Sequence, residues 1–255
     1  MSGQAHEERE RSFGAAKLIA TLTVVSRVFG MVRDIAITSL GANRAVSAFV
    51  FAFKVPNLFR RLFGEGALSA AFVPVFSESS EQEGFERARR LFANAMGLLA
   101  AGLSGLTVLI WIGLLGWHAL WPGEWDRQLL IELLAIMMPF MVTICLLALG
   151  SAALNCRGHF AFPAAAPILL NLVIIAAAWT IVPPWRRDPH SITPGELYRL
   201  GGAVTLAGVI QLVGVLWMLK RYGFSIRPRL RPIEPGIGQI LRLMGPMIVG
   251  LRSEE

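Results

Sequence analysis

Five basic side chains fall inside two segments of the chain that are otherwise apolar. They are Arg27 and Arg33 in the first segment, and Lys54, Arg60 and Arg61 in the second. A cation facing lipid at the bilayer centre costs roughly 2.5–3.5 kcal/mol, so five of them would oppose insertion by on the order of 12–17 kcal/mol. We therefore expect these side chains to face a polar cavity.

The spacing of the polar residues favours one cavity shared by both segments. Residues seven apart lie nearly above one another on a helix, so Arg27 and Asp34 form one stripe in the first segment. In the second segment Asn57 and Arg60 flank a similar stripe, and Glu65 lies beyond it. That stripe consists of Ser47, Lys54 and Arg61. Polar stripes on two consecutive helices can line one cavity.

The balance of charge predicts the class of ligand. Five cations stand against two carboxylates, Asp34 and Glu65, and this surplus of positive charge favours an anion. Guanidinium groups present planar donor forks that match phosphate oxygens, and a pyrophosphate group can engage several of them at once. The sequence therefore predicts a ligand with more than one phosphate.

A structural interpretation of the same residues stays open. Arg33 with Asp34, and Arg61 with Glu65, could form ion pairs, while Lys54 and Arg60 could extend to a membrane interface. Asn171, in a later apolar segment, is as compatible with an interhelical hydrogen bond as with a ligand contact.

The composition of the chain is that of an integral membrane protein. Of its 255 residues, 55% are hydrophobic and 16% are charged, and the mean hydropathy is +0.57. The net charge of +7 has a simpler source than nucleic-acid binding, because the cytoplasmic loops of membrane proteins are enriched in Lys and Arg. We expect no nucleic-acid partner.

The hydropathy pattern predicts an all-α, polytopic membrane helix bundle. A bilayer core of about 30 Å requires roughly 20 helical residues, and six apolar stretches meet that length. They lie at 17–40, 44–63, 91–117, 129–155, 161–182 and 198–219. Pro56, Gly64 and Gly66 interrupt the second stretch, which we expect to form a bent, cavity-lining helix that continues through 67–76. A seventh stretch begins at Ile237 and ends well short of a span.

The loops between these stretches alternate in charge. The N-terminal tail and every second loop hold twelve Lys and Arg residues, against five in the other loops. The positive-inside rule therefore places the N-terminus in the cytoplasm. The predicted parts are a cytoplasmic tail (1–16), a six-helix transmembrane lobe (17–222), a basic, Pro-rich cytoplasmic linker (223–236) and the start of helix seven (237–255).

The sequence offers little that could support catalysis or metal binding. Cys145 and Cys156 lack CxxC spacing and the four histidines are scattered, so neither set predicts a metal site. A nucleophile elbow, a Walker loop, a zincin motif and a dinucleotide fingerprint are all absent from the sequence. We expect neither enzyme activity nor a cofactor.

Two motifs in the first segments resemble the MurJ (MviN) family of lipid II flippases, which belongs to the multidrug/oligosaccharidyl-lipid/polysaccharide exporter superfamily. The first is SRVFGMVRD at 26–34, and the second is AFVFAFKVPNLFRR at 48–61. Shorter matches follow at the family's spacing, namely EGA at 65–67, AFVP at 71–74 and LLN at 169–171. The resemblance extends from about residue 13 to residue 251.

The resemblance implies a transporter of the bacterial inner membrane with a role in peptidoglycan biosynthesis. Members of the family move the undecaprenyl-pyrophosphate-linked precursor, lipid II, between leaflets by alternating access of two six-helix lobes. By matching motif, the residues implied to face the phosphates are Arg27, Arg33 and Arg60, with polar support from Ser26, Asp34 and Asn171. Second-tier candidates are Lys54, Asn57, Arg61 and Glu65.

The chain departs from the family pattern in two ways. Ser47 stands where family members commonly carry Asp, so a charge that could pair a cation is missing. The family has fourteen helices, with a further arginine in the second lobe, whereas this sequence reaches only the seventh. We therefore expect a truncated gene product that would need a second polypeptide to supply the C-terminal lobe.

Two other functions stay open from the sequence. A related exporter of polyprenyl-pyrophosphate-linked oligosaccharides would need a similar basic cavity, although the motifs favour the MurJ family. A non-transporting structural or regulatory membrane subunit could keep the fold without the activity. An exporter of cationic drugs is disfavoured, because it would need a surplus of carboxylates inside the membrane rather than of arginines.

Overall fold

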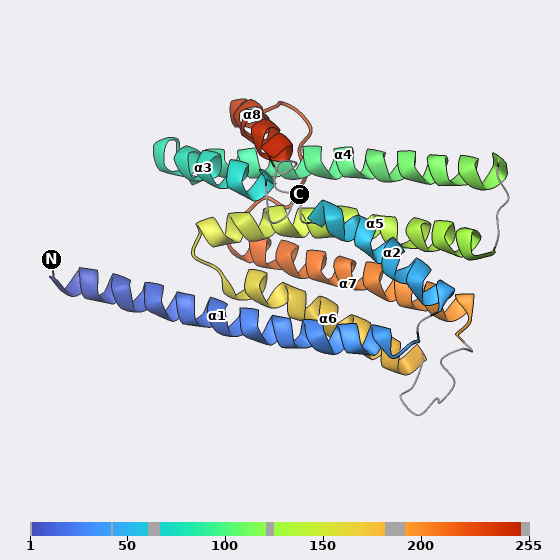
Figure 1. Cartoon of the computed structure of the whole chain (residues 1–255). Helices are drawn as coiled ribbons and strands as arrows, with labels where there is room; N and C mark the ends of the chain where they lie inside the picture. Colours follow the sequence, from blue (N-terminus) through green and yellow to red (C-terminus); the bar gives the residue numbers. More distant parts are fainter. Residues whose placement is uncertain (1, 42, 61–66, 121–124, 182–191, 251–255) are drawn as a thin grey trace.

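The computed structural model describes residues 2–41, 43–60, 67–120, 125–181 and 192–250. Every element of regular structure within those ranges is helical, which confirms the predicted all-α class (Figure 1). The helices are α1 Ser2–Thr38, α2 Arg44–Phe59, α3 Ala67–Gln82, α4 Phe85–Leu120, α5 Trp125–Cys156, α6 Ala161–Ile181, α7 Pro194–Arg221 and α8 Pro235–Gly250.

The central helix of the bundle is α5, which packs against α7, α2, α4 and α3. On one side of the bundle α1 lies along α6, and on the other side α8 packs beside α3 and α4 (Figure 1). The two helices that carry the predicted cations therefore have different neighbours, α6 for α1 and α5 for α2. They form facing walls rather than a closely packed pair.

Four of the described helices are long and apolar enough to cross a membrane. They are Phe85–Leu120, Arg127–Cys156, Ala161–Ile181 and Pro194–Arg221, and they match the third to sixth predicted spans. Neither α1 nor α2 is among these four, and α2 has only 16 residues. The predicted count of six spans and the start of a seventh is therefore not confirmed, although α8 occupies most of the seventh stretch.

The first helix begins earlier than the sequence pattern predicted. The predicted span begins at residue 17, whereas α1 is continuous from Ser2 to Thr38. The cytoplasmic position of residues 1–16 stays a prediction. The added residues include three Glu, two Arg, three Ala and one Gln, all of which have high helix propensity. Hydropathy marks only the apolar part of such a helix, so it misses a polar extension.

The second predicted helix appears as two separate elements. It begins at Arg44, where the side chain of Asn43 accepts a hydrogen bond of 2.8 Å from the backbone N–H of Val46 and caps the first turn. It ends at Phe59, and α3 then begins at Ala67. The predicted break at Gly64 and Gly66 lies outside the described residues.

Glycine brings α5 and α7 into close contact. A Cβ atom added to Gly208 of α7 would come within 2.3 Å of the hydroxyl of Thr143 and 2.6 Å of the ring of Phe140. Both side chains belong to α5 and both are buried. Small residues at such contacts let the backbones of membrane helices approach, and this contact supports the α5 wall of the site described next.

Candidate functional site

A cavity of about 760 Å³ lies between α1, α2, α5 and α6, with single side chains or pairs contributed by α3 and α7. Much of its wall is small and apolar and comes from α5 and α6. Six residues predicted for the site line this cavity: Ser26, Arg27, Arg33, Asn57, Arg60 and Asn171. Residues from distant parts of the sequence therefore meet around one space.

Arg33 is held in place by three hydrogen bonds. Its Nη1 donates to Asn171 Oδ1 at 2.9 Å, while Nε and Nη2 donate to Asp34 Oδ1 at 3.1 and 2.8 Å. The Arg33 guanidinium also lies 5.9 Å from the centre of the Phe53 ring on α2. The ion pair that the structural interpretation anticipated is thus present, yet the same arginine lines the cavity.

Asn171 connects α6 to α1 at two points. Besides accepting from Arg33, its Nδ2 donates to the backbone carbonyl of Ser26 at 3.2 Å. The residue is buried, with 5% of its surface exposed. Asn171 therefore makes the interhelical bonds expected of a lone intramembrane Asn and also orients an arginine in the cavity wall.

The other two arginines differ in how firmly they are held. Arg60 Nε donates to Asn57 Oδ1 at 2.9 Å, which couples the two cavity residues at the end of α2. Arg27 is exposed and forms neither a hydrogen bond nor an ion pair with any residue that the structure describes. All three guanidinium groups contribute positive charge to the cavity wall.

The charged groups that line the cavity, among the described residues, are all cations. Asp34 contacts Arg33, but its side chain is 66% exposed and does not line the cavity. It therefore offsets part of the charge of Arg33 only. A concave, positively charged space with amide and hydroxyl groups in its wall is chemically suited to an anion that can accept several hydrogen bonds.

The predicted stripes were displaced by about one residue. On α1 the stripe that faces the cavity contains Ser26 and Arg33, seven apart, rather than Arg27 with Asp34. Arg27 reaches the cavity from the edge of that stripe, as a long side chain can. The face of α1 that lines the cavity differs from the predicted one by about one residue. The packing of α1 against α6 determines which face of α1 is left to line the cavity.

The two described members of the predicted α2 stripe do not line the cavity. Ser47 and Lys54 are exposed and absent from its lining, while the neighbouring residues Asn57 and Arg60 line it. Ser47 instead donates a hydrogen bond of 3.0 Å to the carbonyl of Asn43. Two further candidates, Arg61 and Glu65, lie outside the described residues.

Five polar lining residues were not predicted: Thr23, Ser69, Ser151, Asn155 and Gln211. Ser151 and Asn155 lie four apart on one face of α5, so a polar pair in an apolar stretch was a signal that could have identified them. Gln211 of α7 is buried and donates from Nε2 to the carbonyl of Ala166. Together they add neutral hydrogen-bonding groups to a wall whose charges come from α1 and α2.

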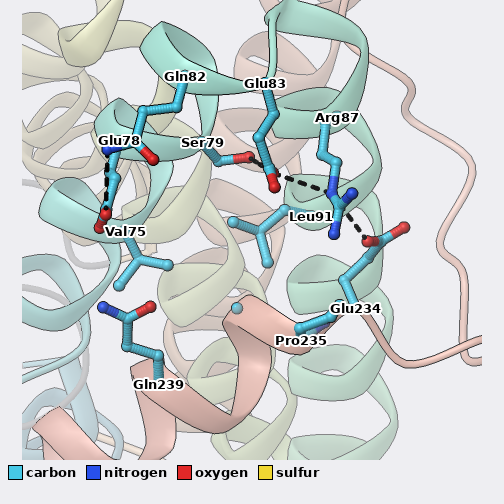
Figure 2. A pocket seen from close by; sticks show the side chains of 11 residues that line it. Val75, Glu78, Ser79, Gln82, Glu83, Arg87, Leu91, Glu234, Pro235 and Gln239 are labelled. Atoms are coloured by element: carbon cyan, nitrogen blue, oxygen red, sulfur yellow. Dashed lines mark hydrogen bonds and ion pairs between the residues drawn. The ribbon is translucent and has the colours of Figure 1, made fainter.

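A second, smaller cavity of about 210 Å³ lies between α3, α4 and α8 (Figure 2). Three of its four charged groups pair with one another: Arg87 Nε lies 2.9 Å from a Glu83 carboxylate oxygen and 3.8 Å from one of Glu234. This cavity lacks the surplus positive charge of the larger one. No cluster of His, Cys, Asp and Glu that could hold a metal ion occurs within the described parts of the chain.

Comparison with known proteins gives a consistent result. The sequence profile described as "Lipid II flippase MurJ" matches residues 36–254. The chain is 33% identical over 254 residues to the probable lipid II flippase MurJ of Vibrio cholerae, covering 93% of this chain and 46% of that protein. It is 34% identical over 247 residues to the lipid II flippase MurJ of Burkholderia cenocepacia, covering 92% and 46%.

Solved structures share the fold. A structure titled "Lipid II flippase MurJ, inward closed conformation" has a TM-score of 0.68 and 20% identity, covering 91% of this chain and 47% of that one. A transporter of the MOP superfamily from Pyrococcus furiosus also has a TM-score of 0.68, at 15% identity, covering 94% and 53%. The chain thus spans about half the length of the proteins that it matches.

Proposed function

The chain belongs to the MurJ family of lipid II flippases, and from that membership we propose that it forms the N-terminal lobe of a lipid II flippase in the bacterial inner membrane. In this proposal the arginine-lined cavity holds the pyrophosphate of the undecaprenyl-linked peptidoglycan precursor. The protein acts as a transporter and not as an enzyme.

The observation that carries this proposal is the convergence of Arg27, Arg33 and Arg60 on one cavity with no carboxylate among its described lining groups. A pyrophosphate carries several negative oxygens on two linked phosphorus atoms, so it can accept from more than one guanidinium at once. The cavity volume also leaves room for part of the attached sugar, which the neutral groups on α5 and α7 are chemically able to bind.

The pairs Asn171–Arg33 and Asn57–Arg60 give the site a defined geometry. Each amide oxygen accepts from a guanidinium, so each arginine is oriented before a ligand arrives. Preorganised donors lose less conformational entropy on binding, which raises affinity for an anion of matching shape. Arg27 then completes the contacts from α1.

The two-lobe mechanism requires more chain than this sequence contains. The curated relatives are about twice as long, and we propose that this chain supplies one lobe of an alternating-access pair with its N-terminus in the cytoplasm. Expression of the 255-residue chain alone in cells depleted of their own flippase is expected not to restore growth, whereas co-expression with a C-terminal lobe from a relative is expected to restore it. Full rescue by the chain alone would refute the need for a second lobe.

A titration with polyprenyl lipids tests the ligand. The purified chain in neutral detergent should bind undecaprenyl pyrophosphate at least tenfold more tightly than undecaprenyl monophosphate, because one further phosphate adds charge-assisted hydrogen bonds of about 1.5–3 kcal/mol each. The uncharged prenol is the control for binding by the tail. Equal affinity for all three lipids would contradict a phosphate site.

Lipid II is then compared with a polyprenyl-pyrophosphate-linked oligosaccharide of another pathway. Tighter binding of lipid II supports the flippase over a related exporter. Tighter binding of the other lipid would assign the chain to such an exporter while keeping the phosphate site.

A further inference from the structure

The linker between α7 and α8 alternates basic and apolar residues. Residues 226–233 read IRPRLRPI. The three arginines are exposed, and so are the apolar residues between and beside them, with Leu230 at 52% and Ile233 at 62%. Single exposed apolar residues are common on protein surfaces. Three of them interleaved with three arginines within eight residues instead favour a neighbour that is both apolar and anionic.

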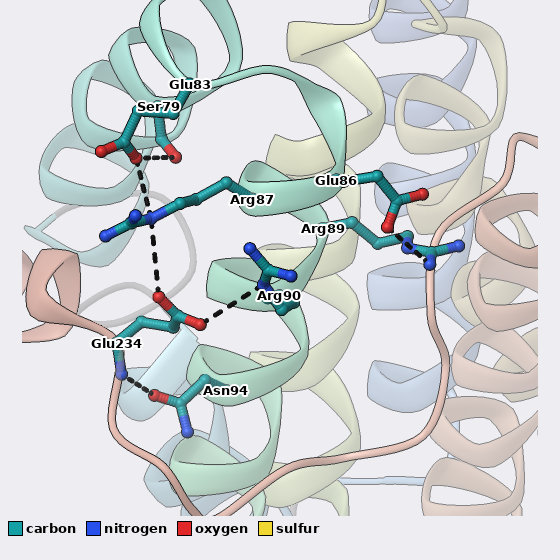
Figure 3. Close-up of polar contacts among 8 residues, drawn as sticks. All are labelled: Ser79, Glu83, Glu86, Arg87, Arg89, Arg90, Asn94 and Glu234. Atoms are coloured by element: carbon teal, nitrogen blue, oxygen red, sulfur yellow. Dashed lines mark hydrogen bonds and ion pairs between the residues drawn. The ribbon is translucent and has the colours of Figure 1, made fainter.

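The backbone of this segment is fixed to α4. Arg229 N–H donates to the carbonyl of Ala93 at 3.0 Å, and Asn94 Nδ2 donates to the carbonyl of Arg229 at 2.9 Å. The N–H of Glu234 donates to Asn94 Oδ1 at 3.0 Å (Figure 3). The buried amide of Asn94 therefore holds the linker at two points, Arg229 and Glu234. The carboxylate of Glu234 lies 3.6 Å from Arg90.

The linker arginines differ from other basic residues at the same end of the bundle. Arg227, Arg229 and Arg231 make neither side-chain hydrogen bonds nor ion pairs with any described residue. By contrast Arg89 lies 2.8 Å from Glu86, and two other arginines stack on aromatic rings, namely Arg157 on Phe85 and Arg221 on Trp217. The backbone of the linker is hydrogen-bonded to α4, and it therefore exposes three guanidinium groups that have no partner among the described residues.

The attachment point lies at the depth of a membrane surface. As a 36-residue helix α4 is about 54 Å long, and a hydrocarbon core of about 30 Å would leave about 12 Å beyond the core at each end of a centred helix. Ala93 lies about 12 Å along the axis from the first residue of α4, Phe85. The linker is thus attached where the hydrocarbon core meets the headgroups.

We propose that residues 226–233 form a binding segment for anionic phospholipids beside α4. The three arginines bind headgroup phosphates, for which guanidinium forks are suited, while Leu230 and Ile233 enter the boundary of the acyl chains. Pro228 and Pro232 restrict the backbone, so little entropy is lost on binding. This site is separate from the cavity, and it would operate whether or not the chain carries lipid II.

Native mass spectrometry of the chain in neutral detergent tests this site, with dioctanoyl phosphatidylglycerol and dioctanoyl phosphatidylcholine as probes. Arg33→Ala and Arg60→Ala are built into every variant, so that the cavity does not contribute. A basic residue near an anionic surface contributes about fivefold in affinity, so changing Arg227, Arg229 and Arg231 to Gln should weaken phosphatidylglycerol binding at least tenfold. Phosphatidylcholine should bind weakly throughout.

The matched control changes Arg89, Arg157 and Arg221 to Gln, which removes the same amount of charge from the same end of the bundle. Because these three arginines already have partners, the control should leave the affinity for phosphatidylglycerol within about twofold. A second variant, Leu230→Ser with Ile233→Ser, keeps all charges and should also weaken binding. The proposal fails if the control loses as much affinity as the linker variant, or if the serine variant loses none. It also fails if inorganic phosphate displaces the lipid at equal concentration.

Discussion

The Arg33→Ala, Arg60→Ala double variant is expected to bind undecaprenyl pyrophosphate at least 100-fold more weakly than the parent chain. Both guanidinium groups line the cavity, and each is oriented by an amide oxygen. A hydrogen bond to a charged group contributes about 1.5–3 kcal/mol, so losing two such donors corresponds to about 3–6 kcal/mol or a factor above about 100. Titration of the detergent-solubilised chain measures this change.

Lys54→Ala is the matched control for that variant. Lys54 is a cation of α2 that is exposed and takes no part in lining the cavity. Its removal should leave the affinity nearly unchanged, and the circular dichroism of every variant should show the same helix content. Equal losses in Lys54→Ala and in either single arginine variant would show that net charge, and not the geometry of the cavity, controls binding.

Gly97→Ala is expected to release the linker from α4 and to lower the free energy of unfolding by about 3 kcal/mol. A Cβ atom at Gly97 would lie 2.5 Å from the carbonyl oxygen of Arg229 and 2.8 Å from its backbone nitrogen. Backbone atoms cannot rotate away as a side chain can, so either the linker or α4 must move. Thermal unfolding and the rate of tryptic cleavage after Arg229, which Leu230 follows, measure the two consequences.

The control for this variant is Gly102→Ala in the same helix, where an added Cβ would meet nothing within 4 Å. Gly102→Ala gains the same helix propensity as Gly97→Ala, up to about 1 kcal/mol, but its added Cβ does not meet the linker. Gly97→Ala should be less stable and cleaved faster than Gly102→Ala. Similar stability and similar cleavage of the two variants would contradict the docking of the linker on α4.

The sequence was sufficient to predict that arginines gather in the cavity. Arg33 and Arg60 stood out because a cation in an apolar stretch must find a polar environment, and that reasoning needs no tertiary information. Helical geometry gives only the relative angles of residues on one helix, however. It could not indicate that Ser26 with Arg33, rather than Arg27 with Asp34, faces the cavity, because the packing of α1 on α6 selects that face.

The same limit explains Lys54 and the linker. Lys54 shares a seven-residue spacing with its predicted partners, but α2 buries Phe49, Ala52 and Phe53 and leaves the lysine exposed outside the cavity lining. The contact of the linker with α4 joins residues more than a hundred positions apart through Asn94. No local pattern in the sequence encodes such a long-range hydrogen bond.

The hydrogen bonds of Arg33 determine how many of its N–H groups remain for an anion in the cavity. A guanidinium has five N–H groups, and those directed at Asp34 and Asn171 use one each on Nε, Nη1 and Nη2. Only two N–H groups remain, on a side chain that cannot swing, so Arg33 dictates the direction from which a phosphate oxygen must approach. Arg27 forms no hydrogen bond or ion pair with any described residue, so its five donors can follow an anion that changes position within the cavity.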